Sequence, residues 1–509
     1  MKITQSSSLF RSTTLVLSLS GVLLGCTTPR TSELSPAELQ QIAKDRLTRV
    51  VASEQEPVTK SIDLYEAMAR ALKYNLDQKV EYREQILRGS EFDVESYDML
   101  PDVALAANFS GRDNNPGSFS IDVPNGDSRS EVATRSSERE QANADLTLSW
   151  DMLDYALARV RSQQASDEIW IAREQRRATI NRVIEDVRTA YWRAVSAQRL
   201  DSRIDRLEKS AQQALAQAYA QERQQVGDPL DALTYQREVL GILRSIQELR
   251  RDLGIAKNQL AALMNLPQNQ RYSVVVPSHA SLDAPIIHAD PMQLVRLAVQ
   301  NRPELREVSY RQRINDLEND AALAEIIPDL GVFVGLNWTS NDLIYNNDWV
   351  DYGADTSWNL MNIFRLKDRR RVIKDGDALL DARALALTQA VSAQVFVARA
   401  RLESLRTEAD IARRYHNTSD RISIRTRAAV SAGSSGQRDA VREEMNAVLG
   451  SLRYDATYAE LQTAFANLYS AIGLDPYSPE LDGNESVDEM AAVLRNLWAQ
   501  RGDKMALKE

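Results

Sequence analysis

The chain has 509 residues, and 62 Lys and Arg against 72 Asp and Glu give it a net charge of −10. This acidic balance argues against a dedicated nucleic-acid binder, which needs a basic surface. A single Cys excludes an internal disulfide or a CxxC site, and His279, His288 and His416 lack the spacing of metal ligands, so we expect no metal and no cofactor.

The first 25 residues have the pattern of an export signal. Lys2 and Arg11 precede a short apolar run over residues 15–24, which is too short to span a bilayer. The segment Leu23-Leu24-Gly25-Cys26 resembles the lipobox of bacterial lipoproteins, which implies cleavage before Cys26 and its acylation. By the same resemblance, Thr27 favours sorting to the outer membrane. An ordinary secretory signal with an incidental Cys26 is the alternative.

From residue 26 to residue 60 the chain is polar and has no clear period, so we expect a mostly irregular segment behind the anchor. Apolar side chains then recur at helical spacing, and the predicted helix runs from about residue 61 to Leu100-Pro101, where proline ends it. A second helix of this kind is predicted from about residue 290 to Ile327-Pro328. Both helices lead directly into strands.

Four runs of alternating apolar and polar residues predict two strand hairpins, at 101–151 and 328–359. Apolar side chains on one face include Val103, Leu105, Leu146, Leu148, Val332, Val334, Val350 and Tyr352, and the other face carries Asp145, Asp351 and Asp355. Each run is close to the ~9 to 11 residues of a membrane strand. A half-buried soluble sheet has the same pattern, but two hairpins in one exported chain favour a barrel. Four strands cannot close a membrane barrel, so several chains must contribute.

An unusually long helix is predicted after each hairpin. Residues 151–226 contain neither Gly nor Pro, and residues 359–432 contain a single Gly. Apolar and Ala positions recur every three or four residues, as in a coiled-coil seam. Gly227 and Asp228 suit a helix end followed by a new N-cap, and Gly433 marks the corresponding reversal in the second half. Each long helix is therefore followed by a shorter, antiparallel one.

The two halves are copies of one another. Ser149-Trp150 returns 208 residues later as Ser357-Trp358, and Asn265-Leu266-Pro267 is answered at the same offset by Gly473-Leu474-Asp475-Pro476. We therefore predict repeat 1 at 61–286, repeat 2 at 287–476 and a tail at 477–509. The tail is expected either to form one short amphipathic helix or to be disordered.

This duplicated order of helix, two strands, long helix and short helix resembles the TolC-type outer-membrane factors, including the outer membrane efflux lipoproteins. The resemblance covers residues 62–477 and includes Ala71-Leu72-Lys73-Tyr74-Asn75 and the run from Leu297 to Leu305. It implies a mainly α fold with a small β part. Long antiparallel helices would form a periplasmic tunnel, and four strands per chain would join a 12-stranded transmembrane barrel in a homotrimer.

The resemblance further implies a channel, the exit duct of a tripartite efflux or type I secretion system, in the outer membrane of a Gram-negative bacterium. Its expected partners are a periplasmic membrane-fusion adaptor, an inner-membrane pump and outer-membrane lipid. The expected adaptor-docking or gate tips are Arg223, Val226, Gly227, Asp228, Arg427, Val430 and Gly433. In the second tip the glycine lies two residues further along than the family's Arg-x-x-x-Gly pattern requires, so its adaptor contacts stay open.

Conduction is expected to be passive, with a gate at the tips. The inward carboxylates Asp145, Asp351 and Asp355 either make the lumen prefer cations or simply hydrate its wall. The sequence contains no GxSxG, HExxH or Gly-rich phosphate loop, so an enzyme is not expected. A lipid-anchored periplasmic coiled-coil scaffold without channel activity is the alternative, but it leaves four alternating strands unexplained. Nothing in the chain identifies the cargo.

Overall fold

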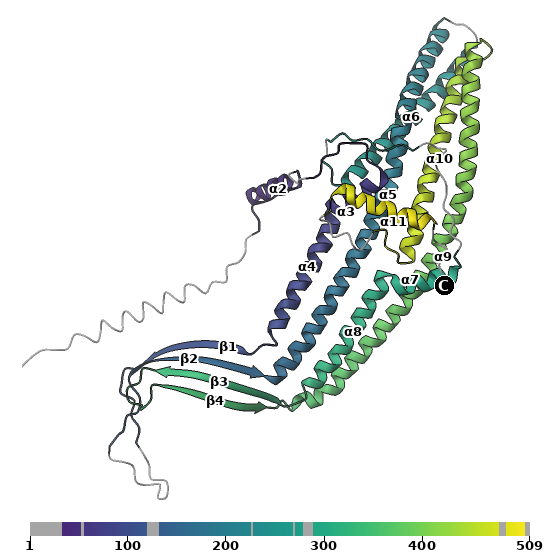
Figure 1. Ribbon diagram of the computed structural model, residues 1–509. Coiled ribbons are helices and arrows are strands. Elements are labelled where there is room, and N and C mark those ends of the chain that lie inside the picture. Colours follow the sequence, from purple (N-terminus) through teal and green to yellow (C-terminus); the bar gives the residue numbers. More distant parts are fainter. Residues whose placement is uncertain are drawn as a thin grey trace, which may run out of the picture. The chain divides into compact units, whose positions relative to one another are not determined.

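A computed structural model describes residues 33–51, 55–119, 132–224, 228–267, 270–277, 289–477 and 485–503. The chain divides into two units, residues 1–56 and 57–509. Its described elements are α2 (Pro36–Val51), α3 (Leu64–Tyr74), α4 (Leu76–Tyr97), β1 (Asp102–Gly111), β2 (Glu140–Asp151), α5 (Met152–Arg223), α6 (Pro229–Leu263), α7 (Pro291–Asn301), α8 (Pro303–Ala324), β3 (Asp329–Thr339), β4 (Asp348–Ser357), α9 (Met361–Ser431), α10 (Gln437–Ala471) and α11 (Val487–Asp503). The fold is mainly helical, with one small sheet (Figure 1).

The first unit contains helix α2, which corrects the expectation of a mostly irregular segment over residues 26–60. The reason is local. Ser35 and Glu38 form a capping box, in which the Glu38 carboxylate accepts from the Ser35 backbone N–H at 2.7 Å and the Ser35 hydroxyl accepts from the Glu38 N–H at 3.3 Å. Pro36 occupies the first helical position, where its missing N–H costs nothing.

The helix before each hairpin is broken into two, so the prediction of one continuous helix from about 61 to 99, and another from about 290 to 326, is wrong. Asn75 has an extended backbone, and its side chain caps α4 by accepting from the N–H groups of Asp77 and Gln78. In the second repeat, Pro303 begins α8 and holds Arg302 extended. Both breaks had a sequence signal, in the N-capping Asn and in the proline.

The four strands form one antiparallel sheet in the order β1-β2-β3-β4. Its register places Val103, Leu148, Val334 and Tyr352 in one row across the strands. The next row on the opposite face holds Ala104, Thr147, Gly335 and Asp351. One face is therefore apolar and the other polar, as alternation predicted. The apolar face is open: Leu105 is 76% exposed and Tyr352 is 82% exposed.

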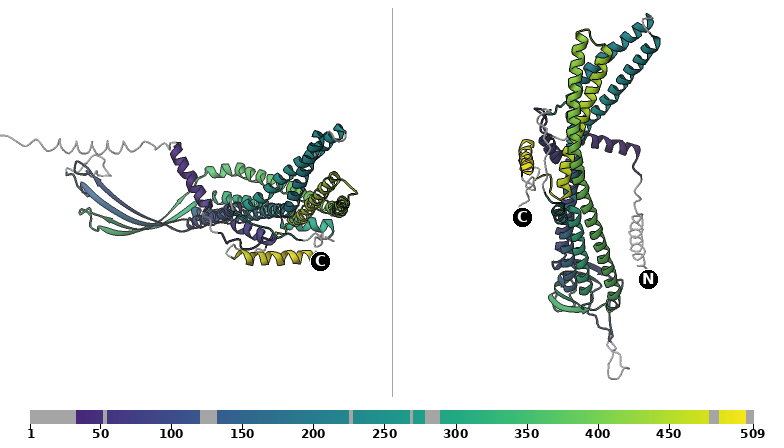
Figure 2. Two further views of the ribbon diagram at one scale, coloured as in Figure 1. Left: turned by 90° about the horizontal axis from the view of Figure 1, so that it is seen from above. Right: turned by 90° about the vertical axis from the view of Figure 1, so that its right-hand side faces the viewer.

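The sheet continues into a row of helices with the same order. The neighbours in this row are α4 with α5, α5 with α8, and α8 with α9, and further along α6 packs on α5 and α10 on α9. Two short helices thus lie end to end beside each long one, as their lengths predicted (Figures 1 and 2). None of the described helices combines the length and apolar character needed to cross a bilayer.

The main core lies at the middle of the long helices. Ile184 and Tyr191 of α5 belong to one cluster with Met68 of α3, Val395 of α9 and Leu461 of α10, and all five side chains are buried. A second cluster continues along α5, α6 and α10, with Leu207, Ile246 and Val448 among its members. Both repeats contribute to each cluster, so neither has a separate core.

The tail forms helix α11, which settles the choice between helix and disorder for residues 487–503. Met490, Leu494 and Trp498 are buried on the main core, while Val493 faces outward. The indole of Trp498 lies against two guanidinium groups, with Arg188 at 4.3 Å and Arg501 at 5.1 Å from its ring centroid. Burial lowers the pKa of Arg188 to about 10. This helix therefore fastens the end of the chain to α5 and α10.

Candidate functional site

The three predicted aspartates share the polar face of the sheet. Asp145 lies opposite Asn337 in the β2–β3 pair, and Nδ2 of Asn337 donates to Oδ1 of Asp351 at 2.8 Å. Asp355 lies opposite Gly331, where a Cβ atom would come within 2.9 Å of its carboxylate. Strand register alone therefore brings the three carboxylates to one face, and Gly331 leaves room for the carboxylate of Asp355.

Sequence alternation missed two aromatic side chains on this polar face. Phe333 lies between Gly331 and Gly335 on β3 and covers Gly353 of β4, where an added Cβ would stand 2.7 Å from the Phe333 ring. Trp349 lies opposite Asn337. The sequence did hold a signal for Phe333. Alternate residues of a strand face the same side, so Gly331, Phe333 and Gly335 share one face of β3.

The two helix reversals far from the sheet hold the predicted tip residues. Asp228 caps α6 by accepting from the Leu230 N–H at 2.9 Å, and Val226 and Gly227 lie outside the described residues. In the second reversal Gly433 has a φ of +73° and donates to the Val430 carbonyl at 3.0 Å. This left-handed backbone favours glycine and ends α9.

The charged side chains of the tips have different surroundings. At the end of α5, Nε of Arg223 donates to the Tyr219 carbonyl at 3.3 Å within its own helix. In the second repeat, Nε of Arg427 lies 3.7 Å from a carboxylate oxygen of Glu444 on α10. The predicted tip residues thus belong to two separate turns, and of those that the structure describes only Arg427 joins a wider ionic network.

Near the tips, one carboxylate joins the two helix pairs, which sequence reasoning did not identify. Glu238 of α6 accepts from Nη2 of Arg442 at 3.0 Å and from Nε of Arg438 at 3.2 Å, both on α10. The hydrogen bond from Arg442 is the main reason why the pKa of Glu238 lies below its usual value. Residues about 200 apart in sequence form this link, so no local pattern predicts it.

A second link lies further from the tips. Arg203 of α5 donates to Glu444 of α10 at 2.8 Å and to Asp420 of α9 at 2.9 Å. Burial acts to raise the pKa of Glu444, but hydrogen bonds from Arg203 and Ser423 outweigh it and hold the pKa below its usual value. One guanidinium therefore joins the α5–α6 pair to the α9–α10 pair.

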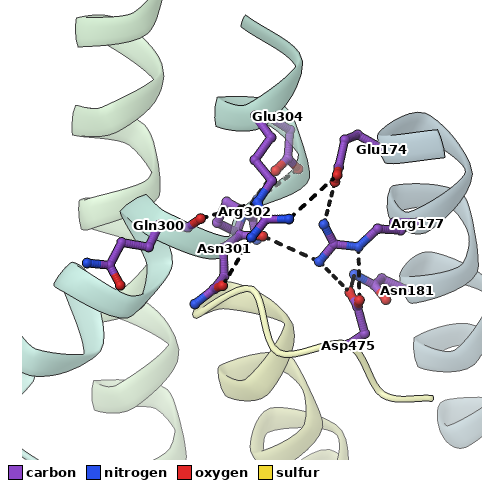
Figure 3. A network of polar contacts seen from close by, with 9 residues as sticks. Glu174, Arg177, Asn181, Gln300, Asn301, Arg302, Glu304 and Asp475 are labelled. Atoms are coloured by element: carbon purple, nitrogen blue, oxygen red, sulfur yellow. Dashed lines mark hydrogen bonds and ion pairs between the residues drawn. The ribbon is translucent and has the colours of Figure 1, made fainter. Parts of the chain in front are cut away.

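A third polar network joins the repeats at the level of the core (Figure 3). Arg177 of α5 donates to both carboxylate oxygens of Asp475, at 2.9 and 3.2 Å, and also binds Glu174. Its Nη2 also contacts the Asn301 carbonyl at 3.4 Å, at the end of α7. Burial would lower the pKa of Arg177, but Asp475 and Glu174 raise it above its usual value. The loop after α10 is thus tied to the first repeat.

Cys26, the predicted lipidation site, lies outside the described residues. Among the residues that the structure describes, no three His, Cys, Asp or Glu side chains come together as a metal site would require.

Known proteins give a family and a fold. Residues 78–266 match the family model described as outer membrane efflux protein. No curated protein matches the chain by sequence. Among solved structures, the CmeC outer membrane channel of Campylobacter jejuni is similar with a TM-score of 0.63 and 13% identity, over 87% of this chain and 95% of that one.

Two further channel structures agree. The MtrE outer membrane channel of Neisseria gonorrhoeae, in its open state, gives a TM-score of 0.60 at 17% identity, over 84% of this chain and 95% of that one. CusC gives 0.60 at 17% identity, over 83% and 96%. Residues 78–266 thus match the outer membrane efflux protein family by sequence, and over most of its length the chain has the fold of outer-membrane channels.

Proposed function

We propose that three copies of this chain form an outer-membrane exit duct for a tripartite efflux or type I secretion system. The family match over residues 78–266 supports a place in the outer membrane of a Gram-negative cell, with the helices in the periplasm. Each copy would supply its four strands to a 12-stranded barrel and its helices to a tunnel. Conduction would be passive, and the energy would come from an inner-membrane pump that acts through a membrane-fusion adaptor.

The observation that carries this proposal is a two-faced sheet with two unpaired edges. β1 and β4 pair on one side only, and the apolar face of all four strands is open. In lipid, an unpaired strand edge leaves backbone groups without hydrogen bonds, so the edges must meet those of other copies. An apolar face of this extent suits lipid, and the opposite face of Asp, Asn, Thr and Gly suits an aqueous lumen.

The gate is proposed at the tips of α5–α6 and α9–α10. The links from Glu238 to Arg438 and Arg442, and from Arg203 to Asp420 and Glu444, hold the two helix pairs of one copy together. Breaking these links would let the pairs separate and widen the tunnel. The adaptor would dock on the turns that carry Arg223, Val226, Gly227, Asp228, Arg427, Val430 and Gly433.

The lumen would prefer cations, because a threefold assembly turns Asp145, Asp351 and Asp355 into rings of carboxylates. The mature chain would begin at an acylated Cys26, which adds a lipid anchor to the barrel.

The proposal is tested by measuring size and conductance in one preparation of the mature protein in detergent. We expect a trimer by sedimentation and stepwise single-channel currents in planar bilayers. A monomer that gives no channels would overturn the proposal.

A further inference from the structure

We propose that the ends of α4 and α9 next to the sheet form a charged joint between two copies of this chain. The acidic end of α4 consists of Glu91, Asp93, Glu95 and Asp98, and the basic start of α9 consists of Arg365, Lys367, Arg369, Arg370, Arg371 and Lys374. The acidic end of one copy contacts the basic start of the next. This inference rests on the proposed trimer and identifies a contact that would align neighbouring copies within it.

Topology brings these two segments to matching positions on opposite sides of the chain. Helix α4 leads into β1 and α9 follows β4, and these strands are the two outer strands of the sheet. The helices are likewise the first and last of the row α4, α5, α8, α9 (Figure 1). Both charged segments lie within about 20 Å of the sheet, at ~1.5 Å per helical residue. When β4 of one copy pairs with β1 of another, the two segments become neighbours.

The charges of the two segments are opposite and concentrated. Residues 89–100 contain four acidic side chains and no Lys or Arg. Residues 365–374 contain six basic side chains and one acidic, Asp368, in a chain whose net charge is −10. The acidic segment of one copy therefore attracts the basic segment of another, whereas two acidic or two basic segments repel each other.

Within one copy, most of these side chains have no ionic partner. Among the described residues, no ion pair is formed by Asp93, Glu95 and Asp98 on α4 or by Arg365, Lys367, Arg370 and Lys374 on α9. The others are paired: Glu91 with Arg88, Arg371 with Asp368, and Arg369 with Glu318 and Glu325. Arg365 lines a groove between α8 and α9 of its own copy, and the other unpaired charges are available to a second copy.

The chain already contains one joint of this kind. Arg369 of α9 contacts two carboxylates at the sheet end of α8, Glu325 and Glu318, the latter at 3.8 Å. Helices α8 and α9 are antiparallel neighbours next to paired strands, which is the arrangement proposed for α4 and α9 of adjoining copies.

The first repeat shows that the fold itself does not need the basic start. At the same offset of 208 residues, α5 keeps Arg159 and Arg161 in place of Lys367 and Arg369. At the other four positions it carries Leu157, Ser162, Gln163 and Ser166 where α9 carries Arg365, Arg370, Arg371 and Lys374. Helix α5 has neighbours on both sides within the chain, α4 and α8, whereas α9 has only α8 in this row. The extra charge therefore occurs on the helix whose outer neighbour must come from another copy.

Exposed apolar side chains accompany the charges. Val94 is 63% exposed and Tyr97 71% exposed on α4, and Phe364 is 74% exposed on α9. Apolar contact favours burial without choosing a register, whereas opposite charges favour only the contact of α4 with α9. The joint would therefore fix the head-to-tail order of a closing ring and the register of β4 on β1, where a slip of one residue would reverse both faces.

Charge reversal tests the joint in the full mature protein. We compare Asp93→Lys with Glu95→Lys, Lys367→Glu with Arg370→Glu, and all four changes together, by sedimentation in detergent at low salt. We expect each pair alone to reduce the trimer fraction at least tenfold and the fourfold variant to restore it. The control Asp201→Lys with Asp252→Lys makes the same change in net charge as the acidic pair, at exposed helix positions away from the joint, and should leave the trimer intact.

Circular dichroism separates misfolding from lost assembly, because a dissociated variant keeps the helical signal of the wild type. Unchanged trimers in both pairs, or helical fourfold variants that stay monomeric, would overturn the joint and leave the proposed duct standing. A wild type that is itself monomeric would overturn both.

Discussion

Single carboxylates on the sheet set the chemistry of its polar face. Asp351 is held by Asn337, and Asp355 occupies the space above Gly331, so both side chains lie flat on the neighbouring strand. A methyl group added at Gly331 would push the Asp355 carboxylate away, and one added at Gly335 would displace Asp351. The positions of the charges therefore depend on small residues opposite them.

Replacing Asp351 and Asp355 by Asn should reduce the preference of the channel for cations, because two rings of negative charge disappear at nearly constant side-chain volume. The reversal potential under a salt gradient in planar bilayers measures this preference and should move toward zero. Asp348→Asn is the control, since Asp348 lies opposite Trp338 on the apolar face. An unchanged reversal potential in the double variant would mean that these carboxylates only hydrate the wall.

Trp498 is the residue on which the attachment of the tail most depends. Its buried ring contacts Arg188, Arg501 and Tyr469, and its indole N–H donates to the Pro476 carbonyl at 3.2 Å. Trp498→Ala should lower the free energy of unfolding by about 3 to 5 kcal/mol, as for other large aromatic truncations in cores. Val493→Ala on the outer side of α11 should change it by less than ~0.5 kcal/mol. Denaturant unfolding followed by circular dichroism compares the two, and equal losses would contradict this account.

At the scale of elements, both repeats end their last helix in the same way. Asn265 has a φ of +53° and Gly473 a φ of +76°, and in each case the next residue donates back to the helix, Leu266 to Ala261 at 2.8 Å and Leu474 to Tyr469 at 3.0 Å. An Asn and a Gly thus form the same left-handed cap. Gly473 also approaches the backbone of Asn301 so closely that a Cβ would lie 2.6 Å away.

The link between α6 and α10 should respond to pH. The pKa of Glu238 is lowered by Arg442, so the link is fully present above the ordinary Glu pKa of ~4.3 and is lost as pH falls through the lowered value. A link of partly exposed charges is worth about 1 kcal/mol, enough to change the open fraction several-fold. We expect the open probability to be low at neutral pH and to rise only as pH falls below ~4.3, through the lowered pKa of Glu238.

Glu238→Gln should reproduce the acid effect, with a higher open probability at pH 7 and a smaller further rise as pH falls below ~4.3. Single-channel recording at neutral and at acid pH measures it. Glu248→Gln on the same helix is the matched control, because among the described residues Glu248 pairs only with Arg244, one turn away. A wild-type channel that closes further in acid would contradict the role of this link.

At the scale of the whole molecule, the two repeats are interdependent. The main core combines α3 and α5 of the first repeat with α7, α9, α10 and α11 of the rest of the chain. The network of Arg177, Asp475 and Asn301 crosses the same boundary (Figure 3). A duplicated sequence has thus become one folding unit beyond residue 57.

A fragment of residues 57–286 should therefore not fold cooperatively alone, because removing the second repeat exposes the apolar faces of α3 and α5. Thermal unfolding should show no sharp transition, and co-expression with residues 287–509 should restore a complex with one. The intact chain from residue 57 is the control. A sharp transition of the isolated fragment would show that each repeat folds separately.

The sequence by itself determined the elements and their order. Period, alternation and capping residues act over short distances, so they located two strand hairpins, two long helices, the reversal at Asp228 and the duplication around Trp150 and Trp358. Local signals of the same kind mark the capping box at Ser35 and the helix break at Pro303.

Only the tertiary structure decided which side chains meet across long separations. Glu238 reaches Arg442, Arg203 reaches Glu444, and Arg177 reaches Asp475, over 204, 241 and 298 residues of sequence. Such pairs depend on how antiparallel helices align after the chain has reversed several times, and no local pattern encodes that alignment. The same holds for the charged ends of α4 and α9, whose signs are readable in the sequence but whose positions at the two edges follow from strand order.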